Sequence, residues 1–205
     1  MTSPEPDSVG ADENFVRPTG ARSDRIHQAI LTAAAELLDE GGLPVATMDA
    51  IAARSGASKA TLYKHWPSRT AVAAEAFGDL MARALPLPDT GDTARDLTEQ
   101  VVRVSAFYAS DRGRVFAQLL AACVDDPTGA AYFRRYFLDG RRIAIDTLWR
   151  RGIDRGDVDA DLAIDDVIDI LFGPLIFRRL SGHYALTEEH ARRLADTALP
   201  ALLSR

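Results

Sequence analysis

Residues 47–69 read TMDAIAARSGASKATLYKHWPSR, and the fold predicted for the whole chain is built around them. Thr47 is a hydroxyl cap in front of residues at the spacing of one helix face: Met48, Ile51, Ala52 and Ser55. Gly56 then interrupts the helical pattern, because a tight turn with positive φ favours glycine. A second helix can begin at the Ser58 cap and end before Pro67. The stretch therefore predicts a helix-turn-helix, a motif whose second helix can lie in a DNA major groove.

The second predicted helix, residues 59–65, carries polar groups suited to nucleic acid. Leu62 is its main apolar residue, and Ala60 and Trp66 are the other candidates for facing the protein interior. The remaining side chains can bond to phosphates or to base edges: Lys59, Thr61, Tyr63, Lys64 and His65. From the spacing alone, an ordinary surface helix with solvated lysines is as good an interpretation as a DNA-reading helix.

The pattern T-x-x-x-I-A-x-x-x-G-A-S-x-x-T-L-Y-x-H-W-P-S-R in this stretch resembles the N-terminal signature of the tetracycline-repressor (TetR) family of transcriptional regulators. The resemblance extends upstream to Arg22. Carried over by position, it implies contacts to DNA bases or phosphates from Thr47, Ser58, Lys59, Thr61, Tyr63, Lys64, His65 and Arg69. Asp49 departs from the family pattern, because many members have a basic or neutral residue there and a carboxylate disfavours a nearby phosphate.

Charge is distributed unevenly along the chain, whose net charge is -6. Residues 1–46 carry three arginines against eight acids, and residues 71–205 are also acidic in sum. Residues 47–70 reverse this balance, with Arg54, Lys59, Lys64 and Arg69 against Asp49. Because screening confines charge effects to about 8–10 Å at ordinary salt, this local surplus matters more for a nucleic-acid contact than the total.

Composition excludes several classes of protein. Hydrophobic residues make up 47% of the 205 residues, which is enough for a packed core. No apolar run reaches the ~18–20 residues that span a bilayer, and the N-terminus lacks the pattern of a secretion signal, so we expect a cytoplasmic protein without membrane partners. One cysteine cannot form an internal disulfide. Neither metal-ligand spacing nor a catalytic motif is found, so we expect no metal, no cofactor and no enzymatic activity.

Helical periodicity predicts an all-α fold with a three-helix helix-turn-helix head and a larger helical body. The family resemblance implies that this C-terminal body binds a ligand and forms the dimer. We expect residues 1–21 to be a disordered tail, residues 22–69 the DNA-binding domain, and residues 70–205 a connector helix followed by the regulatory body. Helices are predicted over 23–40 behind the motif and over 68–85 as the connector. Turn signals divide the body into five further helices, over 92–109, 111–125, 128–155, 161–181 and 187–204.

The last two predicted helices are expected to form a subunit interface. The helix from residue 161 is apolar on more than one face, so one face can pack on its own body and another on a partner. The candidate interface residues are Ile168, Leu171, Leu175, Leu194, Ala198 and Leu199. The family resemblance implies an antiparallel four-helix interface in a homodimer, whose two heads, ~34–36 Å apart, read a palindromic DNA operator. A monomer with a thick core is the alternative.

Aromatic residues gather in the body and are compatible with a cavity for a small-molecule effector. The candidates are Phe107, Phe116, Trp149, Phe172 and Phe177, although aromatic residues at helical spacing more often form ordinary core. The sequence as a whole predicts a TetR-type repressor that a small molecule releases from DNA. Two alternatives stay open. One is a ligand-independent regulator or an activator, and the other is a helical ligand-binding or enzymatic protein whose head has lost DNA binding.

Overall fold

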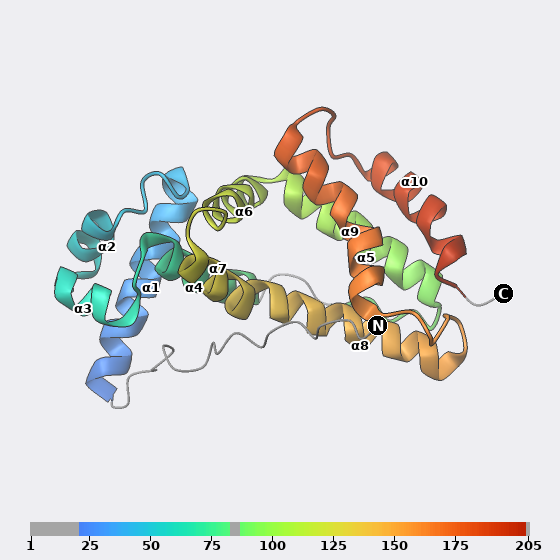
Figure 1. The fold of residues 1–205 in the computed structure, drawn as a ribbon, viewed down its shortest axis with the longest axis horizontal. Helices are drawn as coiled ribbons and strands as arrows, with labels where there is room; N and C mark the ends of the chain where they lie inside the picture. The colour runs from blue at the N-terminus through green and yellow to red at the C-terminus, as the bar shows by residue number, and fades with distance from the viewer. Residues whose placement is uncertain (1–20, 83–86, 204–205) are drawn as a thin grey trace, which may run out of the picture.

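The computed structural model describes residues 21–82 and 87–203, and this part of the chain is helical without any strand. One isolated antiparallel bridge joins Val158 to Leu203. The predicted all-α fold, with a three-helix head and a larger helical body, is confirmed (Figure 1). The tail predicted over residues 1–21 lies outside the described residues, except for Ala21 at the start of the first helix.

The head consists of three helices: α1 (Ala21–Gly41), α2 (Met48–Ser55) and α3 (Lys59–His65). The predicted turn between α2 and α3 is present, because Gly56 ends α2 with a φ of 71°. Leu62 and Trp66 are fully buried against α1 and its neighbours, as expected. Ala60 is exposed and does not face inward, because the short helix turns only one narrow face to the core.

Helix α4 (Arg69–Ala82) follows the head and packs against both α1 and α7 (Pro127–Phe133). Its inner side is formed by Val72, Ala76, Phe77 and Met81, all of them buried. The connector predicted over 68–85 is therefore present as far as Ala82, and residues 83–86 are outside the described part. Because α4 contacts a head helix and a body helix, it joins the two parts rigidly through packing rather than as a free linker.

The body continues with α5 (Thr93–Ala109), α6 (Asp111–Ala122), α7, the π-helical turn η1 (Arg134–Leu138), α8 (Asp139–Arg155), α9 (Ile164–Ser181), α10 (Glu188–Ala198) and the 3₁₀ turn η2 (Leu199–Ala201). Helix α5 packs on α9, α8 and α10, and α10 lies at the end of the molecule away from the head (Figure 1). The helix predicted over 128–155 is one continuous run, but its middle is a π-turn. Such turns are rare and frequently mark functional sites.

None of the helices in the described ranges combines the length and the hydrophobicity that a membrane crossing requires. The longest apolar helix of the body, α9, carries Asp165, Asp166 and Pro174, and its apolar side chains are taken up mainly by packing within the chain.

Gly78 allows α4 to approach the backbone of η1 closely. A Cβ atom at this position would lie 2.2 Å from the carbonyl oxygen of Tyr136, which is backbone and cannot rotate away. We expect Gly78→Ala to lower the free energy of unfolding by about 1–3 kcal/mol, as for other overpacked sites. Urea unfolding followed by circular dichroism measures the change. Gly140→Ala on α8 is the matched control, because a Cβ there meets no atom within 4 Å; equal midpoints for both variants would contradict the prediction.

Candidate nucleic-acid interface

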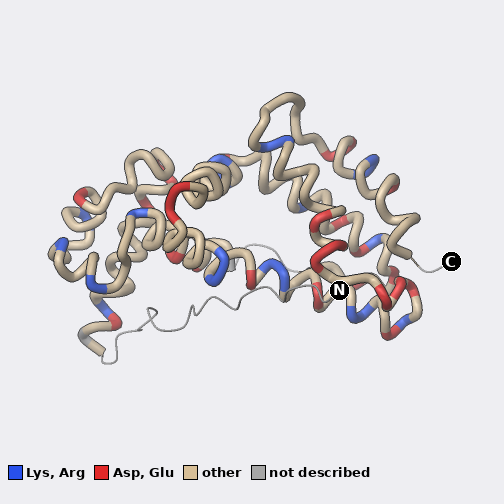
Figure 2. Tube along the Cα trace, viewed as in Figure 1, with Lys and Arg blue, Asp and Glu red and all other residues tan. Residues whose placement is uncertain are grey.

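Helix α3 presents its polar face to solvent at the end of the head. Leu62 turns inward and is fully buried, whereas the next residue, Tyr63, is 55% exposed. Lys59 and Lys64 are also exposed. Figure 2 shows basic positions around α2 and α3, whereas acidic positions gather near the turn between α8 and α9, at the other end of the molecule. The only lysines of the chain therefore lie on an outward-facing helix, as a groove-binding helix requires.

Capping hydrogen bonds hold α3 and α2 in place. The Ser58 hydroxyl oxygen accepts the backbone N–H of Thr61 at 3.1 Å, and the two hydroxyl groups are 2.8 Å apart. The Thr47 hydroxyl oxygen accepts the backbone N–H of Ala50 at 3.1 Å. Each cap keeps its hydroxyl near the protein surface, and Arg69 is exposed at the start of α4. The structure thus brings the residues predicted for DNA contact to one end of the head, with Thr47, Thr61 and His65 half-buried.

Asp49 forms an ion pair with Lys59, with 2.5 Å between its carboxylate oxygen and the lysine Nζ. The hydrogen bond to Asp49 raises the pKa of Lys59, so the lysine keeps its charge at neutral pH. Both side chains are exposed, and exposed pairs contribute little stability, so a phosphate can replace Asp49 at low cost. The one residue that departs from the family pattern therefore pairs with a lysine of α3 rather than leaving a lone negative charge.

A buried carboxylate beneath α3 connects the three helices that surround it. Glu75 of α4 is 2% exposed. Its Oε2 accepts the indole N–H of Trp66 at 2.6 Å, and its Oε1 lies 3.0 Å from Nε2 of His27 on α1. The His27 ring stacks on the Trp66 ring with 4.6 Å between centroids. This cluster sets the position of the C-terminal end of α3 relative to α1 and α4.

His65 lies beside this cluster at the last residue of α3. Burial lowers the pKa of His65, and the nearby His27 and Lys64 lower it further. These effects favour the neutral imidazole in the DNA-free protein.

Body residues bond directly to the head. The hydroxyl of Tyr132 on α7 donates a hydrogen bond to the backbone carbonyl oxygen of His65 at 2.9 Å. The hydroxyl of Ser68 donates to the carboxylate of Asp126 at 2.6 Å, and Asp126 also caps α7 by accepting the N–H of Gly129 at 2.8 Å. Any movement of α7 therefore acts on the end of α3 and on the start of α4.

Comparison with known proteins connects this geometry to a family. The chain matches "Bacterial regulatory proteins, tetR family" over residues 30–76 and "Tetracyclin repressor-like, C-terminal domain" over residues 87–198, which is more than half of its length. The chain belongs to the TetR family. It is thus a DNA-binding transcriptional regulator of the helix-turn-helix type, as the sequence predicted.

Relatives of this TetR-family chain match it over nearly their whole length. It is 34% identical over 177 residues to the uncharacterized HTH-type transcriptional regulator YdeS of Bacillus subtilis strain 168, covering 86% of this chain and 89% of YdeS. It is 28% identical over 179 residues to the regulator Rv1556 of Mycobacterium tuberculosis strain H37Rv, with 86% and 87% covered. The crystal structure of the TetR-family regulator SCO0332 superposes with a TM-score of 0.75 at 28% identity, covering 86% and 97%. Regulators of this family bind DNA operators and function as dimers.

The body of this TetR-family chain encloses a cavity of about 360 Å³ between α5, α6, η1, α8 and α9. Phe107, Phe116 and Phe172, three of the aromatic residues predicted to bind an effector, line it. Trp149 and Phe177 do not line it. Trp149 belongs to a second, more open hollow on another side of α8. Phe177 is five residues beyond Phe172, which turns it about 140° around α9 and away from the cavity.

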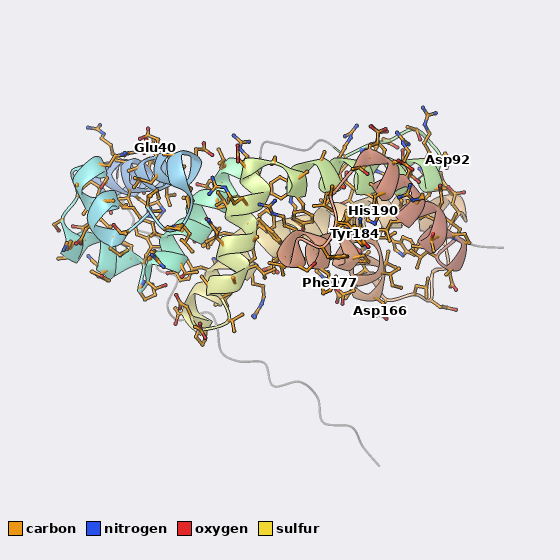
Figure 3. The ribbon with its side chains drawn as sticks, turned by 90° about the horizontal axis from the view of Figure 1, so that it is seen from above. Glu40, Asp92, Asp166, Phe177, Tyr184 and His190 are labelled. Atoms are coloured by element: carbon orange, nitrogen blue, oxygen red, sulfur yellow. The ribbon has the colours of Figure 1, made fainter. Side chains whose placement is uncertain are left out.

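The interface residues predicted on α9 and α10 face their own chain. Leu171, Leu175 and Leu199 are buried within a single copy, and Ile168, Leu194 and Ala198 are half-buried against the same core. Both helices pack apolar side chains on α5 and its neighbours, so the three buried leucines are covered within one copy, and the subunit interface on these helices stays a prediction. The outward face of α9 carries other apolar side chains: Ile170, Phe177 and Leu180, followed by Tyr184. Phe177, Tyr184 and Asp166 lie on the body, far from Glu40 of the head (Figure 3).

The sequence analysis missed several residues that the fold brings to these sites. Glu75 lies within the apolar α4 and shows no local pattern that would place it under α3. Gln100, Tyr108, Phe137 and Arg141 line the cavity from three different elements. They come together only because α5 packs against η1 and α8. That packing could not be predicted from the spacing of residues along the chain.

Proposed function

We propose that this chain is a homodimeric repressor that binds its operator through α3 and is released when a small molecule occupies the body cavity. The outward polar face of α3, above the buried Glu75 cluster, is the observation that carries the DNA-binding part. The bonds between α7 and the head support the release mechanism. A ligand shifts the equilibrium between two conformers only by its difference in affinity for them, so the cavity must change shape when the heads move.

The cavity and the head share structural elements, which supports this coupling. Met81 of α4 and Phe137 of η1 both line the cavity. The same η1 backbone packs on Gly78 of α4, and Tyr132, just before η1, bonds to the end of α3. A ligand that displaces η1 therefore acts on α4 directly and on the end of α3 through α7.

Proteins of the same fold are described with small molecules of different chemistry. FadR of Bacillus subtilis, 15% identical with a TM-score of 0.53, is described in complex with stearoyl-CoA. A transcriptional regulator of Saccharomonospora viridis, 19% identical with a TM-score of 0.55, is described in complex with choline. These complexes support the proposal that a small molecule binds to this chain, and we assign it to the cavity of the body.

The residues that we propose for DNA contact fall into two groups. Tyr63 and Lys64 are exposed on α3 and are proposed to reach base edges or phosphates, together with Lys59 once it leaves Asp49. The others are placed to position the helix through the sugar-phosphate backbone: Thr47, Ser58, Thr61, His65 and Arg69. For the partner surface we propose Ile170, Phe177, Leu180 and Tyr184 in place of the buried leucines.

A direct test uses DNA from upstream of the chain's own gene, with a scrambled duplex of equal length as the control. We expect specific binding that falls steeply with salt. Absence of binding at low salt would overturn the proposal and favour a helical protein that has lost DNA binding. Retained binding in the presence of every ligand that fills the cavity would favour a ligand-independent regulator.

Lys64→Ala is expected to weaken operator binding several-fold and to reduce the salt slope of log Kd by about one for each subunit, since one phosphate contact is lost. Fluorescence anisotropy between about 50 and 200 mM salt measures both quantities. Arg150→Ala removes the same charge from an exposed position of α8 in the body. An unchanged slope for Lys64→Ala, or an equal change for Arg150→Ala, would show that Lys64 holds no phosphate.

A further inference from the structure

The body cavity has an apolar wall with a few polar side chains among its lining residues. The apolar part is formed largely by a phenylalanine wall, namely Phe107, Phe116, Phe137 and Phe172. Gln100 of α5 also lines the cavity, is 2% exposed, and its Oε1 has no hydrogen-bond partner among the described residues. A buried amide oxygen without a partner costs about 1–3 kcal/mol, so the Gln100 amide marks a place where a ligand atom is expected.

Arg141 of α8 contributes a guanidinium group to the same cavity. It is half-buried, and no carboxylate in the described ranges pairs with it. The neighbouring Arg142 differs, because its guanidinium forms two bonds to Asp165, at 2.6 and 3.2 Å. Burial lowers the pKa of Arg141, which reports the loss of water around its charge. A partly desolvated cation without a counter-charge is stabilised by an anion.

Tyr108 adds a hydroxyl group near Arg141. Its side chain is buried in the cavity wall, and its ring packs on Phe116 with 4.7 Å between centroids. Burial raises the pKa of Tyr108, whereas the charge of Arg141 acts in the opposite direction, so the two side chains are near each other. The hydroxyl stays protonated and is available as a donor beside the guanidinium.

Three aspartates also lie around the cavity. Whether their carboxylates need a counter-charge decides whether a cationic or an anionic ligand is expected. Asp139, Asp165 and Asp169 are exposed to solvent, and Asp165 is already neutralised by Arg142. Exposed carboxylates are solvated by water and gain little from a ligand cation. The half-buried Arg141 gains far more from a ligand anion, because its water has been replaced by protein.

We infer that the effector is an apolar molecule with a single carboxylate, which Arg141 and Gln100 bind while its hydrocarbon part packs on the phenylalanine wall. This inference rests on the proposed function, since it names the chemical class of the effector. A planar guanidinium matches a carboxylate with two parallel N–H bonds, and rotation of the Gln100 amide presents its N–H group to the same oxygen atoms.

Titration calorimetry on the full-length dimer with octanoate, 1-octanol and octylamine tests the inference, because the three probes share one chain and differ in head group. We expect octanoate to bind on the order of tenfold more tightly than the other two. Arg141→Gln should remove this preference and leave the affinity for octanol unchanged, and Arg141→Lys should restore part of it. Arg150→Gln, which removes a charge from the same helix outside the cavity, should behave as the original chain. Thermal unfolding of each variant checks that it folds.

The outcomes separate the inference from the proposed function. Tighter binding of octylamine, equal binding of octanol and octanoate, or no binding of any probe would overturn the inference. Operator binding is measured independently by anisotropy. If the chain binds octanoate through Arg141 but binds no operator, the inference stands and the proposed function is contradicted. If the chain binds its operator and prefers octylamine, the proposed function stands and the inference is contradicted.

Discussion

Glu75→Ala is expected to lower the free energy of unfolding by about 3–5 kcal/mol, the cost of removing one partner from a buried polar pair. The variant leaves the indole N–H of Trp66 and the imidazole of His27 buried without their acceptor. Because Trp66 follows α3 directly, its displacement also changes the orientation of that helix, and operator binding should be lost together with stability. Urea unfolding and anisotropy with operator DNA measure the two effects.

The control for this prediction is Glu40→Ala, on the surface of the same head (Figure 3). Glu40 pairs with Arg54 at 2.6 Å, but both side chains are partly exposed, so its loss should change the free energy of unfolding very little. Glu75→Gln retains one acceptor and places an NH₂ group against the other donor. Its free energy of unfolding should therefore lie between those of Glu75→Ala and Glu40→Ala. Unfolding midpoints that coincide for Glu75→Ala and Glu40→Ala would refute the structural role of the buried carboxylate.

Phe177→Glu is expected to convert the dimer into folded monomers. Phe177 is 65% exposed on one chain and lies beside the His183 ring, with 5.3 Å between centroids. Ile170 on α9 and Tyr184 just after α9 are also exposed, so these apolar side chains are mostly uncovered in one copy and a second copy is the expected cover. Two-fold symmetry brings the new carboxylate into the interface twice, and each must lose water there.

Monomers of this kind should bind the operator at least about 100-fold more weakly, because the two heads no longer act at a shared effective concentration. Sedimentation velocity measures the association state, and circular dichroism verifies that the helices remain. Val124→Glu introduces the same charge at an exposed apolar residue in the turn before α7 and should remain dimeric. A Phe177→Glu protein that sediments as a dimer would place the interface elsewhere.

The local geometry of the head could be predicted from the sequence in detail. The Thr47 and Ser58 hydroxyls cap their helices by bonding to backbone N–H groups three residues further along the chain. The positive φ of Gly56 depends on that residue alone. These interactions involve only a few consecutive residues, so the order of residue types along the chain is enough to predict them. The family resemblance then extended this local geometry to the fold and to the class of function, both of which are confirmed.

The outward face of α9 could not be predicted in the same way. Leu171 and Phe177 are both apolar, and the helix is apolar around most of its circumference, so the pattern did not distinguish the side that packs on α5 from the side left for a partner. The cavity presented the same difficulty, because Gln100 and Arg141 belong to helices separated by two others along the chain.

The amino-acid sequence alone established the helix-turn-helix, its caps and its local positive charge, since these depend on neighbouring residues. The packing of distant helices was needed to place Glu75 under α3, to join Arg141 with Gln100 in one cavity and to leave Phe177 outside. Burial is a property of the assembled fold: a side chain loses its water only when elements far apart in the chain come together around it.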